Sequence, residues 1–380
     1  MPHRGTRSVA ITLTSLSQVA ALGFDDIIDV RAPAEWAEDH IPGAISLPVL
    51  DDAERARVGT IYKRESPFRA RKVGAALVAK NAAAHLEGPL ADKPGGWQPL
   101  VYCWRGGQRS GSFASILSQI GWRVETVAGG YKTFRSLVVQ ALYDAPLLSR
   151  VIVLDGNTGT AKTDLLALMA AGGVQVIDLE GLANHRGSLF GGRAGGQPSQ
   201  KGFESRLAMA LAALDPGRPV VVEAESSKIG ECRMPPRLWR AMVAAPRLAV
   251  SAPLAARAAY LARAYADLTA DPVELARVIN RLRPMQAAAT IDRWLALAAT
   301  GAFEPLAAEL MALHYDPRYT KQRSLTQAQS AQVVEAHSLT AEALPALAEE
   351  LTARIIRLGQ SIMMIGGNIA SHSCVAQVSA

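Results

Sequence analysis

A buried-strand pattern that runs into a glycine-containing loop and then a helix is the feature that most limits how this chain can fold. The apolar residues Val151–Leu154 are followed by the loop DGNTGTAKT and by a helical run over 164–171. Backbone N–H groups of such a loop can surround a di- or triphosphate at the start of a helix, with a lysine ammonium beside them. The order strand–loop–helix therefore predicts a P-loop in an α/β domain with a parallel sheet. The predicted phosphate-binding residues are Gly156, Asn157, Thr158, Gly159, Thr160, Ala161, Lys162 and Thr163.

Ala161 stands where this motif has its second glycine. If the position requires a positive φ, an alanine there costs stability and can reshape the phosphate cradle, whereas at a helical position it is harmless. A plain glycine-rich turn is the alternative interpretation of the whole segment. Lys162 and Thr163 favour the phosphate site, and Thr163 is the candidate ligand for Mg²⁺.

A single cysteine, Cys103, follows a second short apolar strand at 99–102 and precedes a helical run over 110–120. A thiol at the start of a helix lies near unpaired backbone N–H groups, and two nearby arginines add positive charge, so the thiolate is favoured. The alternative is a small buried apolar residue. The predicted anion-binding loop around the catalytic Cys103 consists of Trp104, Arg105, Gly106, Gly107, Gln108 and Arg109.

Acidic residues follow two further strand patterns after the P-loop. Glu223 and Glu225 lie at the end of the pattern at 218–225, and Asp178 lies near the end of the pattern at 174–180. P-loop proteins keep an acid at such a place to support a metal ion or water. We therefore expect these three carboxylates to support the phosphate site, with ordinary strand-end charge as the alternative.

Basic residues are concentrated after the P-loop. The whole chain has a net charge of +6 and a pI near 9.3. Between Arg233 and Arg283 nine arginines face three acids, a balance of 9 − 3 = +6 that equals the excess of the whole chain. This pattern suits a polyanionic partner, although solvated helix faces would give it too. A long glycine-rich loop at 181–204 is also basic, and 314–319 (HYDPRY) could stack a base or fill a buried turn. The candidate contacts to such a partner are His185, Arg186, Arg193, Arg237, Arg257, Arg277 and Arg281.

The length of 380 residues allows two to three domains. We predict a first domain over 1–143, a second over 148–360 with a helical C-terminal part, and a weakly structured tail over 361–380. No apolar run is long enough to span a membrane, and the start resembles a signal peptide only loosely, so we expect a folded start. Three cysteines far apart argue against disulfides and zinc and for a reducing cytoplasm; Cys232 and Cys374 receive no role.

The segment IIDVRAPAEWAEDHIPGAISLPV at 27–49, followed by the cysteine loop, resembles a rhodanese domain over residues 8–141. The resemblance implies that Cys103 carries a chalcogen as a persulfide-type group cradled by backbone amides. Arg109 follows Cys103 with five residues between them, one more than in many sulfurtransferases. That spacing resembles the dual-specificity phosphatase relatives, although Tyr102 stands where those enzymes have histidine.

The chain resembles the tRNA 2-selenouridine synthase family in its domain order, a rhodanese-like domain followed by a P-loop domain. It also resembles that family in three segments, DLEGLANHRGSLFG at 178–191, VVVEAESSKIG at 220–230 and HYDPRY at 314–319. The resemblance implies a transferase acting on the wobble 2-thiouridine of tRNA. It implies S-geranylation by geranyl diphosphate and then replacement of the S-geranyl group by selenium from selenophosphate. Cys103 would serve the selenium step and the P-loop around Lys162 would hold the diphosphate, while the basic residues would meet tRNA.

The predicted fold class is thus α/β, with an N-terminal rhodanese-like parallel-sheet domain and a P-loop α/β domain. Besides Mg²⁺ at Thr163 we expect no tightly bound cofactor, a selenophosphate-supplying enzyme as partner, and no membrane. Two other functions stay open. One is a phosphatase or sulfurtransferase fused to a P-loop ATPase or kinase, and the other is a non-catalytic sulfur carrier that binds tRNA.

Overall fold

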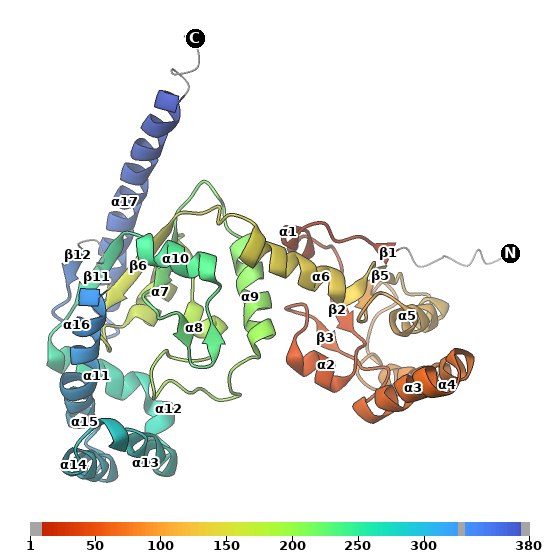
Figure 1. Ribbon diagram of the computed structural model, residues 1–380, viewed down its shortest axis with the longest axis horizontal. Coiled ribbons are helices and arrows are strands. Elements are labelled where there is room, and N and C mark those ends of the chain that lie inside the picture. Colours follow the sequence, from red (N-terminus) through yellow and green to blue (C-terminus); the bar gives the residue numbers. More distant parts are fainter. Residues whose placement is uncertain (1–9, 326–330, 374–380) are drawn as a thin grey trace. The chain divides into compact units, whose positions relative to one another are not determined.

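The computed structural model describes residues 10–325 and 331–373 (Figure 1). Its contacts divide the chain into two compact units. The first unit is Met1–Pro146 with Pro198–Ala213, and the second unit is Leu147–Gln197 with Leu214–Ala380. Each unit contains a five-stranded sheet, and every strand pair within these two sheets is parallel. The predicted α/β class with parallel sheets is confirmed.

The sheet of the first unit has the strand order β1-β5-β4-β2-β3. Its middle strand, β4, is fully buried, as its run of apolar residues predicts. Residues 1–9 of the expected folded start lie outside the described residues, which begin at β1. The strands are β1 (Ala10–Ile11), β2 (Asp26–Asp29), β3 (Ile45–Ser46), β4 (Pro99–Tyr102) and β5 (Glu125–Val127).

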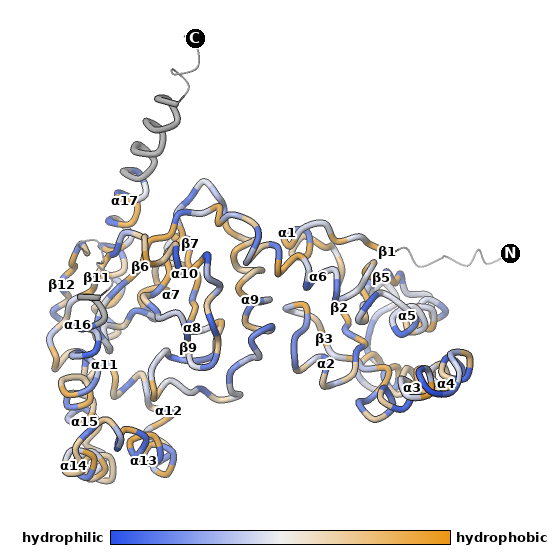
Figure 2. The backbone as a smooth tube through the Cα atoms, viewed as in Figure 1, coloured by the Kyte–Doolittle hydropathy of each residue, from blue (hydrophilic) through white to orange (hydrophobic). Residues whose placement is uncertain are grey.

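Helices of the first unit pack around this sheet and bury a core that includes Val101, Phe113 and Leu117. The outward side of α3 is hydrophilic, and Ile61 is its one buried residue (Figure 2). Its helices are α1 (Leu16–Ala20), α2 (Pro33–Glu38), α3 (Asp52–Arg64), α4 (Pro67–Glu87), α5 (Gln108–Ile120), α6 (Gly130–Val139) and the π-helical turn η1 (Gln140–Asp144).

One helix of the first unit comes from much later in the chain. Helix α9 (Gln200–Ala212) contacts α1, α6 and η1, and it buries Phe203 and Leu207. The sequence analysis placed these residues within a continuous second domain over 148–360. The apolar stripe of an amphipathic helix predicts that one face is buried, but it does not say against which core.

The sheet of the second unit has the strand order β12-β11-β6-β8-β7, and β6 is its middle strand. All six residues of β6 are buried. A separate antiparallel pair joins β9 and β10. The strands are β6 (Val151–Gly156), β7 (Gln175–Ile177), β8 (Val220–Glu223), β9 (Lys228–Ile229), β10 (Cys232–Arg233), β11 (Arg247–Ser251) and β12 (Gln332–Glu335).

The described residues of the second unit form two large hydrophobic cores and a small cluster of Ala258, Ala307 and Met311. One large core lies around the sheet and contains Ile152, Leu165 and Leu351, and the other lies within the helical group α12–α15 and contains Ile279 and Trp294. The helices are α7 (Lys162–Ala171), α8 (Leu179–Leu182), α10 (Pro236–Ala244), α11 (Leu254–Ala264), α12 (Ala266–Thr269), α13 (Pro272–Asn280), η2 (Arg283–Met285), α14 (Ala288–Ala299), α15 (Phe303–Leu310), η3 (Met311–Tyr315), α16 (Asp316–Leu325) and α17 (Leu344–Ser373).

The C-terminal region differs in part from the expectation. From residue 253 onward the sequence analysis expected helices, whereas β12 forms a short edge strand in which Val334 alone is buried. Helix α17 continues to Ser373, so the helix covers much of the tail predicted to be weakly structured, and 374–380 lie outside the described residues. Within the described residues, no helix combines the length and apolar character needed to cross a membrane.

Candidate functional sites

Both loops singled out by the sequence leave the middle strand of a parallel sheet at its carboxyl end. The Cys103 loop joins β4 to α5, and the P-loop joins β6 to α7 (Figure 1). Ligands of open α/β sheets bind at this end of the strands, because the loops and helix N-termini gather there.

Cys103 lies at the bottom of its loop and is only 3% exposed. Its Sγ accepts hydrogen bonds from the backbone N–H of Gly107 at 3.3 Å and from the Ser110 hydroxyl at 3.2 Å. Burial opposes the thiolate, but these hydrogen bonds and the charge of Arg109 outweigh burial and lower the pKa of the Cys103 thiol. These contacts favour a thiolate, and the catalytic role of Cys103 stays a prediction.

Arg109, the arginine of the C-x5-R spacing, is held by Glu35 at the start of α2. Its two terminal nitrogens donate to the carboxylate at 2.7 and 3.2 Å. Burial of Glu35 opposes its ionised form, but Arg109 overrides this and lowers the pKa of Glu35. A phosphate-bearing ligand in the loop would have to share Arg109 with Glu35. Arg105 is exposed to solvent and does not face this competition.

The shape of the loop depends on its contact with the start of α6. Gly106 has φ +64°, and a Cβ there would lie 2.6 Å from the Val127 carbonyl oxygen, so glycine is required. Tyr131 donates its backbone N–H to the Cys103 carbonyl oxygen at 2.8 Å, and Lys132 donates its backbone N–H to the Trp104 carbonyl oxygen at 3.0 Å. The loop is thus fixed on both sides before Gln108 begins α5.

The P-loop in the second unit curls around its own lysine. Lys162 Nζ donates to the Gly156 carbonyl oxygen at 3.0 Å, and the Thr160 hydroxyl donates to the Asn157 carbonyl oxygen at 2.9 Å. Gly159 has φ +85°, and its backbone passes so close to α11 that a Cβ would lie 3.0 Å from the Arg257 carbonyl oxygen. The ammonium group is therefore positioned where this class of loop binds phosphate oxygens.

Ala161 has φ +56° and ψ +26°, the left-handed conformation. The first of the two alternatives drawn from the sequence therefore holds: the position requires a positive φ and alanine carries the strain. Its methyl group is buried in the core around the sheet, which partly offsets this cost.

Arg257 lies beneath the P-loop and not on the surface. It is 6% exposed and donates to the Thr158 carbonyl oxygen at 3.1 Å and to the Asp316 carboxylate at 3.0 and 2.8 Å. Asn157 also donates to Asp316, at 3.1 Å. The sequence analysis proposed Arg257 as a contact to tRNA. In the structure Arg257 instead stabilises the P-loop, because its guanidinium is hydrogen-bonded to Thr158 and Asp316 inside the protein.

Carboxylates gather beside Lys162. Glu223 accepts the backbone N–H of Glu180 at 2.6 Å, and Glu180 accepts the Thr163 hydroxyl at 3.3 Å. Glu180 and Glu225 share a hydrogen bond. Burial raises the pKa of Glu180, and burial together with the neighbouring Glu180 raises the pKa of Glu225. Burial also raises the pKa of Glu223. Asp178, predicted as a supporting acid, accepts the N–H of residue 181 at 2.7 Å and caps α8.

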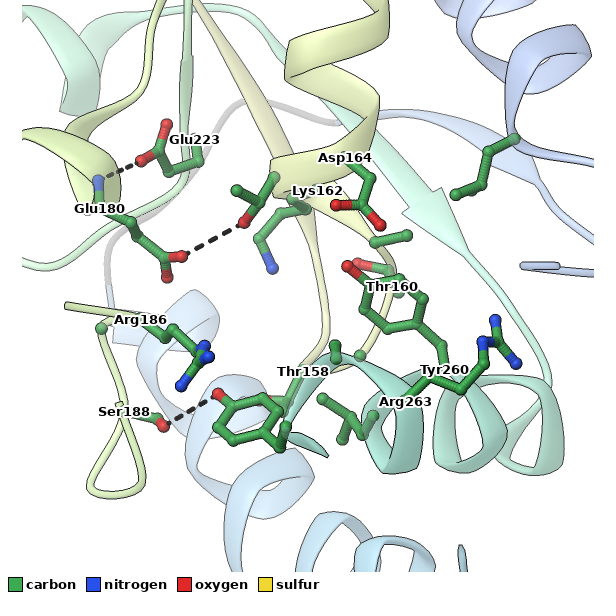
Figure 3. A pocket seen from close by; sticks show the side chains of 18 of the residues that line it. Thr158, Thr160, Lys162, Asp164, Glu180, Arg186, Ser188, Glu223, Tyr260 and Arg263 are labelled. Atoms are coloured by element: carbon green, nitrogen blue, oxygen red, sulfur yellow. Dashed lines mark hydrogen bonds between the residues drawn. The ribbon is translucent and has the colours of Figure 1, made fainter. Parts of the chain in front are cut away.

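These groups surround a cavity of about 430 Å³. Figure 3 shows the Glu180 carboxylate, the Lys162 ammonium and the Arg186 guanidinium pointing towards the same space. Among the described residues no group of three His, Cys, Asp or Glu side chains has the arrangement of a metal site. A P-loop Mg²⁺ needs fewer protein ligands, because phosphates and water complete its shell. The hard oxygens of Thr163 and Glu180 fit such an ion.

The basic loop after β7 reaches the same cavity. Arg186 donates to Asp267 at 2.8 Å and lies over the Tyr265 ring, and Arg193 lines the cavity as well. Burial and the charges of Arg193, Arg186 and Arg281 lower the pKa of His185, so these four predicted contacts lie close together. Arg237 and Arg277 are exposed on α10 and α13, and Arg277 pairs with Glu274.

Several site residues escaped the sequence analysis. Glu180 follows a strand end, as Glu223 does, so the same rule could have found it. Ser110 and Glu35 carry no local signal, because their roles depend on contacts made by the folded loop. Tyr265, whose hydroxyl pairs with the Ser188 hydroxyl at 3.4 Å, is not among the predicted site residues.

The fold and the two loops define a protein in which a rhodanese-like domain with an activated cysteine is joined to a P-loop phosphate-binding domain. Two family descriptions agree with this class. Residues 13–137 match the rhodanese-like domain, and residues 149–277 match the tRNA 2-selenouridine synthase AAA domain.

Curated relatives identify the family more closely. A tRNA 2-selenouridine synthase of Chromohalobacter salexigens is 34% identical over 346 residues, which cover 82% of this chain and 92% of that relative. The chain belongs to the tRNA 2-selenouridine synthase family. A synthase of the same name from Hahella chejuensis is 39% identical over 251 residues, which cover 63% of this chain. Another, from Pseudomonas syringae pv. syringae, is 39% identical over 239 residues, which cover 60% of this chain. In both cases the aligned part spans 63% of the relative's length.

Proposed function

We propose that this protein is a tRNA-modifying transferase. It converts wobble 2-thiouridine to 2-selenouridine through S-geranyl-2-thiouridine, with geranyl diphosphate and selenophosphate as co-substrates. The observation that carries the proposal is that the P-loop cavity continues into an apolar one, in a chain that also holds an activated cysteine. The names of the relatives supply the tRNA substrate.

The apolar cavity supports a prenyl diphosphate as the P-loop ligand. It shares Thr158, Ser188, Leu261 and Tyr265 with the P-loop cavity, and its other walls come mainly from the apolar side chains of α11–α15. Its volume of about 70 Å³ is small, so a geranyl chain requires its walls to open. A polar head at Lys162 and an apolar tail in this cavity match an amphipathic diphosphate ester better than a plain phosphate.

In the geranyl step the sulfur of 2-thiouridine forms a bond to the first carbon of the chain, the carbon–oxygen bond breaks and diphosphate leaves. The base loses its N3 proton to solvent in the same step. Lys162, the Thr163 hydroxyl and the loop amides stabilise the charge that develops on the leaving diphosphate. Mg²⁺ bound at Thr163 would add positive charge to the same oxygens. Arg186, Arg193 and Arg281 provide the positive surface that meets the tRNA backbone, and His185 lies beside them as a polar contact.

In the selenium step the selenium of selenophosphate forms a bond to C2 of the S-geranylated base, the C2–S bond breaks and geranylthiol leaves. Water then cleaves the Se–P bond and releases phosphate, and Cys103 with its loop serves this step. The lowered pKa of the Cys103 thiol favours its thiolate, and the amides of its loop cradle the anionic donor. Arg105 is exposed at the same loop and can contact a phosphate without breaking the Arg109–Glu35 pair.

Nucleoside mass analysis of tRNA from cells with and without this protein, supplied with selenium, tests the proposal. We expect 2-selenouridine and S-geranyl-2-thiouridine only when the protein is present; unchanged levels of both would reject it. Cys103→Ala should stop selenation while geranylation continues, and Lys162→Ala should impair geranylation. Lys228→Ala removes an exposed lysine of the same unit and serves as the control. Cys103-dependent phosphate release without tRNA would instead support the phosphatase alternative.

A further inference from the structure

A third cavity of the second unit lies against the P-loop cavity. Its volume is about 280 Å³, and it shares Gly187, Ser188, Glu225 and Tyr319 with the P-loop cavity. Its other walls come from α10, the start of β11 and the segment 314–319, the HYDPRY motif of the sequence. A ligand here would therefore lie next to a ligand held by the P-loop.

Two buried polar atoms in the walls of this cavity have no hydrogen-bond partner among the described residues. They are Arg247 Nε and the Tyr315 hydroxyl oxygen. Arg247 uses Nη1 to bind Asp155 at 3.0 Å. The Ser188 hydroxyl pairs with Tyr265 at 3.4 Å and lies close enough to the Tyr315 hydroxyl to lower its pKa, although it does not meet hydrogen-bond geometry there. Unpaired buried donors cost free energy and are rare in native proteins, so two of them in one cavity indicate a ligand that carries hydrogen-bond acceptors.

The cavity is also lined by aromatic rings. Trp239 of α10, His314 and Tyr319 contribute ring surfaces, and Trp239 and Tyr319 are half-buried. Such rings favour a planar ligand, because stacking against an aromatic side chain is worth about 1–3 kcal/mol per base. The charge of Arg247 is balanced by Asp155, whereas Arg318 adds a positive charge to the same wall. A planar ligand that has carbonyl acceptors and is joined to a phosphate is a base of a nucleic acid.

We propose that this cavity receives one unpaired pyrimidine base of the RNA substrate, with Arg247 Nε and the Tyr315 hydroxyl donating to its exocyclic acceptors. The inference rests on the proposed function, because it takes the wobble base as the occupant. It adds the place at which the base binds. Because Glu225 and Tyr319 line both cavities, the base would lie beside the diphosphate end of the P-loop ligand.

The test uses the full chain, geranyl diphosphate and an anticodon stem-loop RNA with 2-thiouridine at the wobble position. Tyr315→Phe removes only an unpaired hydroxyl, so the protein should remain folded. Arg247→Lys keeps a cation for Asp155 but removes Nε. Each variant should raise the KM for the RNA about threefold to tenfold, the effect of one lost hydrogen bond, and leave the KM for geranyl diphosphate unchanged. Tyr62→Phe, an exposed tyrosine of the first unit, is the matched control.

A second readout places the base directly. With 5-iodouridine at the wobble position, irradiation should cross-link the RNA to a peptide that contains Trp239, Tyr315 or Tyr319. An unchanged KM for the RNA in both variants would overturn the inference, and so would cross-links confined to other peptides. Loss of these cross-links when free adenosine is added would also overturn it, because it would show that adenosine occupies the cavity. If the wild-type protein transfers no geranyl group, the proposed function fails instead, and cross-linking still decides the occupant of the cavity.

Discussion

Arg257 Nη1 donates a hydrogen bond of 3.1 Å to the carbonyl oxygen of Thr158 and so supports the P-loop from below. The same guanidinium forms a two-point ion pair with Asp316, the first residue of α16. Asp316 in turn accepts a hydrogen bond from the Asn157 side chain. The position of the phosphate-binding loop thus depends on two helices that lie more than ninety residues further along the chain.

Arg257→Ala should therefore damage both stability and phosphate binding. The change leaves Asp316 without its partner and the Thr158 carbonyl without its donor, and breaking a largely buried pair costs about 3 kcal/mol. We expect a lower melting temperature and a loss of inorganic diphosphate binding, measured by thermal unfolding and calorimetry. Arg277→Ala breaks an exposed pair with Glu274 and should change neither. Normal diphosphate binding by a folded Arg257→Ala variant would show that the brace is dispensable.

The positions of both site loops could be predicted because their signals are local. A run such as Val151–Leu154, followed at once by glycines and a lysine, fixes strand, loop and helix within twenty residues. Cys103 was predicted for the same reason: β4 and α5 match their expected ranges to within two residues, because a buried strand and a helix start flank the thiol.

Roles that depend on long-range contacts could not be predicted. Arg257 belongs to an arginine-rich stretch, and charge alone does not tell a guanidinium in solvent from one folded under a loop. The nine arginines of that stretch do not act as one free patch, because Arg247, Arg257, Arg277 and Arg283 make ion pairs with Asp155, Asp316, Glu274 and Asp292. The membership of α9 in the first unit is a property of tertiary packing and left no trace in its periodicity.

Ser110→Ala should make Cys103 less reactive. The Ser110 hydroxyl donates to Sγ at 3.2 Å, and this bond favours the thiolate, so its loss raises the pKa of the thiol. A hydrogen bond to a charged group contributes about 1.5 kcal/mol, which corresponds to roughly tenfold slower alkylation at neutral pH. The pH profile of iodoacetamide alkylation measures this. Ser115→Ala, on the exposed side of α5, should leave the profile in place; an unshifted profile for Ser110→Ala would assign the thiolate to Arg109 and the backbone.

Glu225→Gln should stabilise the fold at neutral and alkaline pH. Burial and the neighbouring Glu180 raise the pKa of Glu225 above its value in the unfolded chain, so the folded protein binds the proton more tightly. The stability of the wild type therefore falls as pH rises from the unfolded pKa through the folded pKa. Glutamine mimics the protonated carboxyl and avoids this loss. Melting temperatures of the two proteins should converge in acid and separate towards pH 8; a constant difference across this range would contradict the assignment.

Ser205→Ala should weaken the hold of α9 on the first unit. The Ser205 hydroxyl donates to the Asp39 carboxylate at 2.7 Å, and the Tyr131 hydroxyl donates to the same carboxylate at 2.6 Å. Burial raises the pKa of Asp39 and these donors oppose that rise, so removing one of them leaves a buried carboxylate poorly paired. The expected cost is about 1–2 kcal/mol in urea unfolding.

The same variant should also loosen the cysteine loop, because Tyr131 joins the two features. Its hydroxyl binds Asp39 and its backbone N–H binds the Cys103 carbonyl oxygen. We expect faster amide hydrogen exchange at Tyr131 in Ser205→Ala, with the protection of the P-loop helix α7 unchanged. Arg206→Ala, at an exposed position of α9, controls for a general effect on the helix. If exchange at Tyr131 stays at the wild-type rate while stability falls, α9 acts on the first unit through apolar packing alone, and Asp39 does not transmit its state to the cysteine loop.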